Sequence, residues 1–105
     1  MKIIIVGAGK VGYTLASNLS LEYNDIILID INSENLSKAE NSLDVMTIKG
    51  NGVSAHTLID AGIKNVDLLI AVTGSDEINM LCCLTGKKLG VKSTIARIRD
   101  PKYAK

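Results

Sequence analysis

The sequence predicts an α/β domain of the doubly wound, Rossmann-like type, and three observations support this prediction. Aliphatic, β-branched runs alternate with amphipathic stretches along all 105 residues, as expected for strands of a parallel sheet joined by helices. Apolar residues make up 47% of the chain although Phe and Trp are absent, which is typical of strands covered on both faces. A glycine-rich loop at residues 7–12 directly follows the first apolar run.

The first half of the chain reads as strand, helix, strand and helix. Residues 2–6 (KIIIV) form a continuous apolar run, and amphipathic residues over 10–22 predict the first helix. A second apolar run at residues 25–30 predicts the next strand. Ser33 has a side chain suited to an N-cap, which predicts a helix over 34–41.

The second half follows the same alternation, with a glycine placed to end each helix. Its expected elements are a strand at 44–48, a short helix from behind Ser54 to Ala61, a strand at 67–72, a helix from Ser75 or Asp76 to Leu89, and a strand at 93–98. Right-handed crossovers then give the strand order 3-2-1-4-5. A full dinucleotide-binding fold has a sixth strand, so we expect residues 1–105 to be one domain, the front part of a longer chain.

The glycine loop and the end of the second strand together predict half of a nucleotide site. Gly7 allows a tight turn, Gly9 lets the backbone approach a diphosphate, and Gly12 lets the helix pack closely on the sheet. The amide groups and dipole at the start of this helix favour the diphosphate. Asp30 ends the second strand, where its carboxylate can accept hydrogen bonds from a ribose diol and disfavour a 2′-phosphate.

Further candidates follow the third, fourth and fifth strands. Asn51 could reach an adenine edge, but it could equally be a turn residue between two glycines. Thr73 and Gly74 lie where the backbone should pass close to the sugar and phosphates. Arg97 and Arg99 are both expected on the last strand, where they share a face and would pair with phosphates or with a facing subunit. Alternatively, their charges keep a solvated edge strand from aggregating.

Several other polar residues have simpler interpretations. Lys10 could reach a phosphate, but a lysine at this position is more often a solvated residue at a helix start. The acids Asp76 and Glu77 fit the helix dipole unless they touch ligand or a partner. His56 reads as a surface residue, because no cluster of Cys and His is present to build a metal site. The adjacent cysteines at 82 and 83 read as reduced, buried thiols of a cytosolic protein.

The composition and the absent motifs narrow the function. A net charge of +1 argues against an electrostatically driven nucleic-acid binder. No apolar run approaches a membrane span, and no signal peptide is expected because Met1 and Lys2 lead directly into a strand. The sequence offers no Tyr-x-x-x-Lys pair, no acid–histidine pair and no P-loop. We therefore expect a nucleotide-binding protein without catalytic residues, and not an enzyme.

Five segments of the chain resemble the N-terminal nucleotide-binding domain of the TrkA family, a domain type called RCK or KTN. They are MKIIIVGAGKVGYTLASNL, ILIDIN, KGNG, AVTGSDEINM and ARIRDP, which follow one another in order over essentially the whole chain. The last two are far more specific than the glycine motif, which many dehydrogenases share. The resemblance implies dinucleotide contacts from Gly7, Ala8, Gly9, Lys10, Val11, Asp30, Thr73, Gly74 and Arg97.

The resemblance also implies a function. Family members bind NAD(H) and also ATP or ADP, and they assemble into dimers or rings of such domains. These rings lie on the cytoplasmic face of an integral membrane subunit that moves potassium, so the family's role is regulatory. Asn51 stands where many relatives have an acid, and Arg99 in relatives approaches the phosphates or a neighbouring subunit. The alternative is the cofactor-binding half of an NAD-dependent oxidoreductase whose substrate domain is absent.

Overall fold

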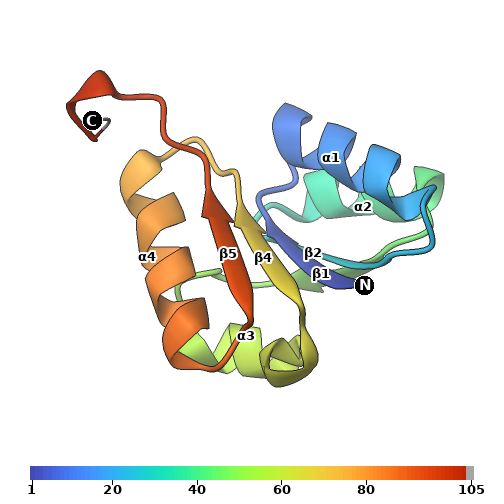
Figure 1. Ribbon diagram of the computed structural model, residues 1–105. Coiled ribbons are helices and arrows are strands. Elements are labelled where there is room, and N and C mark those ends of the chain that lie inside the picture. The colour runs from blue at the N-terminus through green and yellow to red at the C-terminus, as the bar shows by residue number, and fades with distance from the viewer. Residues whose placement is uncertain (104–105) are drawn as a thin grey trace.

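The computed structural model describes residues 1–103 and contains a five-stranded parallel sheet in the order β3-β2-β1-β4-β5 (Figure 1). The strands are β1 (Lys2–Val6), β2 (Asp25–Asp30), β3 (Met46–Lys49), β4 (Leu68–Ala71) and β5 (Ser93–Ala96). The helices are α1 (Lys10–Ser20), α2 (Ser33–Ser42), α3 (Ala55–Asp60) and α4 (Asp76–Lys88), with short 3-10 helices at Ile63–Asn65 and Pro101–Tyr103. The strand order and the parallel pairing confirm the predicted doubly wound fold.

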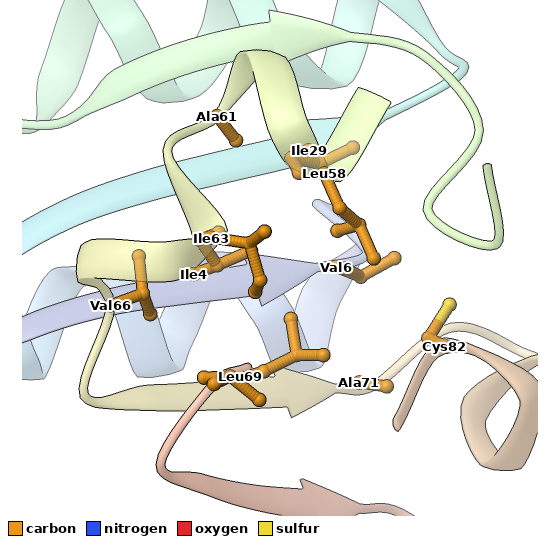
Figure 2. Packing of buried hydrophobic residues seen from close by; sticks show 11 residues of the cluster. Ile4, Val6, Ile29, Leu58, Ala61, Ile63, Val66, Leu69, Ala71 and Cys82 are labelled. Carbon is orange, nitrogen blue, oxygen red and sulfur yellow. The ribbon is translucent and has the colours of Figure 1, made fainter. Parts of the chain in front are cut away.

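The sheet is covered on both faces, and each face has its own aliphatic core. Helices α1 and α2 pack on one face, where Ala16, Leu36 and Ala39 meet alternate residues of the central strands. The other face is covered by α3, the following 3-10 helix and α4. Figure 2 shows this second core, in which Ile63 lies beside Ile4 of β1 and Cys82 of α4 lies near the end of β4. Burial on both faces therefore explains why the central strands are continuous apolar runs in the sequence.

Most helix and strand ends lie within two residues of their predicted positions. The first helix ends at Ser20 and not at residue 22, because the chain turns there and Tyr23 adopts a positive φ of 59°. The second helix is capped by Asn32, whose Oδ1 accepts the Asn35 amide at 2.9 Å, so the prediction of Ser33 as N-cap was wrong. The third strand is shifted to Met46–Lys49.

The last strand is shorter than predicted, and this changes the interpretation of two arginines. Strand β5 ends at Ala96, so Arg97 and Arg99 lie beyond it and the argument that they share one strand face was wrong. The Arg97 amide still donates to the carbonyl of Ala71 at 2.9 Å, which extends the ladder by one hydrogen bond. Beyond Arg97 the chain leaves the sheet and runs past the start of α4 (Figure 1).

Within residues 1–103, none of the helices combines the length and the apolar character that crossing a membrane requires.

Candidate functional site

A crevice of about 340 Å³ lies at the carboxyl ends of the strands, where β1 and β4 part. This is the switch point at which ligands bind in doubly wound sheets. Of the predicted ligand-binding residues, those that line the crevice are Gly7, Gly9, Asp30, Asn51, Thr73 and Gly74. Ala8, Lys10, Val11 and Arg97 lie outside its lining.

A larger hollow of about 440 Å³ lies at the opposite edge of the sheet, among the amino ends of the strands. Its polar lining comes from scattered side chains such as Lys2, Asp25 and Asp44. Its lining includes neither the glycine loop at residues 7–12 nor the start of any of the four α-helices. Since ligands of this fold bind at carboxyl strand ends, the smaller crevice is the candidate site.

The glycine loop forms one wall of the crevice through backbone geometry. Gly7 has a φ of +109°, a conformation that side-chain-bearing residues rarely adopt. A Cβ at Gly12 would lie 1.6 Å from the Gly7 carbonyl oxygen, so helix α1 approaches the loop too closely for any other residue. A Cβ at Gly9 would meet no atom within 4 Å, because this position faces open space. The predicted roles of Gly7 and Gly12 in the turn and in close packing are therefore confirmed.

Helix α1 differs from the other three α-helices in having no side-chain cap at its start. Its N-cap is Gly9, no side chain caps its first amides, and no acid lies in its first turn. Helices α2, α3 and α4 are capped by the side chains of Asn32, Ser54 and Ser75. An uncapped helix start leaves amide donors and a partial positive charge directed outward. The start of α1 is therefore suited to an anionic ligand at the crevice.

The carboxylate of Asp30 is fixed against the glycine loop. One oxygen accepts the Ala8 amide at 2.6 Å, and the other accepts the Asn32 amide at 2.8 Å. The Ala8 amide is thereby used within the protein, so Ala8 acts by orienting Asp30. A carboxylate has further acceptor capacity beyond these two bonds. Asp30 can thus accept a ribose hydroxyl in addition to its backbone partners.

The loop after β3 supports one of the two interpretations of Asn51. Its side-chain oxygen accepts the Val53 amide at 3.0 Å, the pattern of an Asx turn. Gly52 beside it is buried, and a Cβ there would lie 2.3 Å from Val6. The structure therefore favours Asn51 as a turn residue at the rim of the crevice, and a contact with adenine stays a prediction.

The β4–α4 turn forms the opposite wall, and here a residue that the sequence analysis did not single out is central. Asn79 on α4 is fully buried. Its Oδ1 accepts the amide and the hydroxyl of Thr73 at 2.8 and 2.7 Å, and its Nδ2 donates to the Arg97 carbonyl at 2.9 Å. The hydroxyl of Thr73 therefore points into the protein. The signal available in the sequence was an Asn inside the predicted helix, where this residue type is disfavoured unless its side chain has a specific partner.

The acids that begin α4 bind the segment after β5. Asp76 is 9% exposed and accepts the amides of Arg99 and Asp100 at 3.0 and 2.8 Å. These two hydrogen bonds, of which the one from the Asp100 amide has the larger effect, hold the pKa of the Asp76 carboxyl below its ordinary value. Glu77 accepts the Tyr103 hydroxyl, which lowers the pKa of Glu77 and raises that of Tyr103 to about 12.

Two other sequence interpretations are confirmed. His56 is a surface residue whose Nε2 lies 3.3 Å from Asp60 on the same short helix, away from the crevice. Cys82 is fully buried, and burial raises its thiol pKa to about 12, so it is an unreactive part of the core. Cys83 is a free thiol too but is only partly buried, so the prediction of two buried thiols holds for Cys82 alone. Over residues 1–103 we find no cluster of three side chains that could hold a metal ion.

Comparison with known proteins identifies relatives over nearly the whole chain. Residues 3–105 match the TrkA-N domain family. The chain is 48% identical over 104 residues to the Trk system potassium uptake protein TrkA of Haemophilus influenzae, with 98% of this chain but 23% of that protein covered. The chain thus spans about a quarter of the length of this relative.

Two solved structures share the fold at low sequence identity. The C-terminal domain of Kef from Shewanella denitrificans in its AMP-bound form superposes with a TM-score of 0.81 at 20% identity, covering 99% of this chain and 63% of that one. The GsuK channel superposes with a TM-score of 0.84 at 24% identity, covering 97% of this chain and 18% of that one. Both support the Rossmann-like assignment.

Proposed function

The chain belongs to the TrkA-N domain family, and from this premise we propose that it is the nucleotide-sensing domain of a Trk-type potassium uptake regulator. In this proposal an adenine nucleotide binds across the carboxyl ends of the strands. The bound nucleotide biases the arrangement of paired domains, and that arrangement biases an attached integral membrane transporter subunit. A ligand can do so only if it binds the two arrangements with different affinity.

The observation that supports nucleotide binding most strongly is the uncapped start of α1 beside a fixed carboxylate. The first amides of α1 have no side-chain cap, and Gly9 leaves open space in front of them. In our proposal the diphosphate lies there, bound by the amides of Gly9, Lys10 and Val11. Asp30, held 2.6 Å from the Ala8 amide, accepts the ribose hydroxyls.

The remaining lining suits the base of the nucleotide. Ile31 and Ile78 both line the crevice and are 70% and 41% exposed, an unusual position for large aliphatic side chains. Their apolar surfaces offer contact to the flat face of a base. NAD(H) and ATP or ADP each carry a ribose, a diphosphate and an adenine. All of them remain candidates for the physiological ligand.

The crevice favours a sensor over a catalyst. Its lining consists of glycines, aliphatic side chains, amides, the inward-directed Thr73 and one carboxylate, Asp30, which already accepts two backbone amides. This set can bind and orient a nucleotide, but it supplies no acid–base pair for hydride transfer. We therefore propose no enzymatic role.

The proposed partners follow from the relatives and from α4. The matching relative is named as a potassium uptake protein, which supports a location at the inner face of the cell membrane beside a transporter subunit. On α4, the apolar residues Ile78, Leu81 and Leu84 are 41%, 50% and 56% exposed. This exposure favours a surface that pairs with a second copy of the domain over a position in the core.

Thermal unfolding of the chain with NAD, NADH, ATP and ADP tests the proposal. A nucleotide at 100 times its dissociation constant should add about 2.7 kcal/mol to the free energy of unfolding. The variant Asp30→Ala should lower the affinity of the chain for every ribose-bearing ligand. Asp25→Ala, an exposed acid at the other end of β2, is the matched control and should bind normally. Absence of stabilisation by all four nucleotides, or nucleotide-dependent hydride transfer to a substrate, contradicts the proposal.

A further inference from the structure

The wall of the crevice formed by the β4–α4 turn is joined by side chains to the segment that leaves β5. We call residues 97–103 the exit segment. It runs past the start of α4 at the same edge of the sheet as the crevice (Figure 1). The two stretches are more than twenty positions apart in the chain, so their contacts are tertiary.

Asn79 provides the first connection. Its Oδ1 accepts both the Thr73 amide and the Thr73 hydroxyl, while its Nδ2 donates to the carbonyls of Thr73 and Arg97 at 3.2 and 2.9 Å. The two N–H donors and the oxygen of the Asn79 side-chain amide therefore all have partners. No aliphatic side chain of similar size could replace these bonds, so Asn79 holds the end of β4 and the start of the exit segment together.

Asp76 provides the second connection, one turn earlier on α4. Its two oxygens accept the consecutive amides of Arg99 and Asp100. The guanidinium of Arg99 in turn donates to the carbonyl of Gly74, the residue that lines the crevice. Hydrogen bonds thus run in both directions between the turn and the exit segment.

We propose that Asn79 and Asp76 are positioning residues that join the crevice wall at Thr73 and Gly74 to the exit segment, so that a nucleotide bound against this wall also fixes the exit segment. The exit segment cannot move away without breaking its bonds to Asp76, to the Gly74 carbonyl and to Asn79, which itself holds Thr73. A nucleotide that restrains the turn therefore restrains the exit segment, and by linkage a displaced exit segment weakens nucleotide binding. This inference rests on the proposed nucleotide binding.

Amide hydrogen exchange, measured residue by residue by NMR on the chain with and without saturating ADP or NADH, tests the connection. The amides of Arg99 and Asp100, which donate to Asp76, should exchange at least about fivefold more slowly with nucleotide, the lower end of ordinary coupling between sites. The variant Asp76→Asn, which lies outside the crevice lining, should still bind nucleotide but lose most of this slowing. Asp60→Asn, the same change on α3, is the control and should behave as the wild type.

The outcomes separate the two proposals. If the wild type binds neither nucleotide, the proposed function fails. If it binds nucleotide while Arg99 and Asp100 exchange at an unchanged rate, the connection is overturned although the proposed function stands. The wild-type measurement alone tests the connection, so the test does not depend on whether the variant folds. Slowing that persists in Asp76→Asn also overturns the assigned role of Asp76.

Discussion

The two walls of the crevice are built by different means. The wall after β1 depends on backbone geometry: Gly7 turns with a φ of +109°, and Gly12 allows α1 to approach the Gly7 carbonyl. The wall after β4 depends on side chains, because Asn79 and Asp76 hold the turn and the exit segment by hydrogen bonds. The first wall is determined within one short motif, whereas the second needs residues of α4 and of the exit segment, which are far apart in the chain.

This difference has consequences for both rigidity and function. A wall made by close backbone packing has no alternative arrangement at low energy, so it suits the constant part of a ligand, the diphosphate. A wall held by a few polar side chains can open by exchanging those bonds for water. We therefore expect a bound nucleotide to change the conformation of the second wall more than that of the first. Substitutions in the two walls should differ in their effects on stability and binding.

The largest effect is expected for Gly12→Ala in the first wall. Its Cβ would lie 1.6 Å from the Gly7 oxygen, and the neighbouring atoms are backbone and cannot rotate away. We expect a loss of about 3 kcal/mol or more in the free energy of unfolding, measured by urea denaturation. Gly9→Ala is the matched control: with no atom within 4 Å of its Cβ, it should change stability by less than about 1 kcal/mol. Equal effects of the two substitutions would contradict a wall fixed by backbone contact.

The same contrast explains what the sequence could predict. The strand order, the structural roles of Gly7 and Gly12 and the position of Asp30 at a strand end follow from motifs whose residues lie close together in the chain. The bonds of Asp76 and Asn79 to the exit segment join residues 18 to 24 positions apart, and no local pattern specifies such partners. The placement of Arg97 and Arg99 on the last strand was wrong for a related reason, since β5 ends at Ala96.

In the second wall, the largest loss is expected for Asn79→Leu. The substitution keeps the approximate size of the side chain but removes the Asn79 partner of the Thr73 amide and of the Arg97 carbonyl, while the Thr73 hydroxyl retains the Ser75 carbonyl as acceptor. Unsatisfied buried polar groups cost about 1–3 kcal/mol each, so we expect a loss of about 2–3 kcal/mol in urea denaturation after partial rehydration. Asn18→Leu on the exposed side of α1 is the control and should have an effect below about 0.5 kcal/mol. A stability loss no larger than that of the control would show that water replaces these bonds freely.

Gly9→Val tests the first wall through binding alone. Its side chain would occupy the open space before the α1 amides, where the diphosphate is proposed to lie. We expect the affinity for ADP to fall by at least about tenfold, which corresponds to about 1.4 kcal/mol, while the thermal midpoint stays close to that of the wild type. Isothermal titration calorimetry measures the affinity. Undiminished binding in a folded variant would move the diphosphate away from Gly9.

The smallest effect is the pH dependence that Asp76 gives to the stability of the second wall. Asp76 has a pKa below its ordinary value of 3.8, first because of the Asp100 amide, then the Arg99 amide, and further because Arg99 and Arg97 are positively charged nearby. Since the folded pKa lies below the unfolded one, the stabilisation is complete above the ordinary pKa and is lost as pH falls through the lowered value. The gap in unfolding free energy between wild type and Asp76→Asn should therefore be constant at neutral pH and narrow in acid. Glu77 and Asp67 also have lowered pKa values, but they are present in both proteins, so the difference isolates Asp76.

The control is Asp67→Asn, at the opposite edge of the sheet. Its gap in unfolding free energy from the wild type should also narrow in acid, but amide exchange at Arg99 and Asp100 should not change. A gap that does not change with pH would mean that the exit segment is held by Asn79 and not by the charge of Asp76.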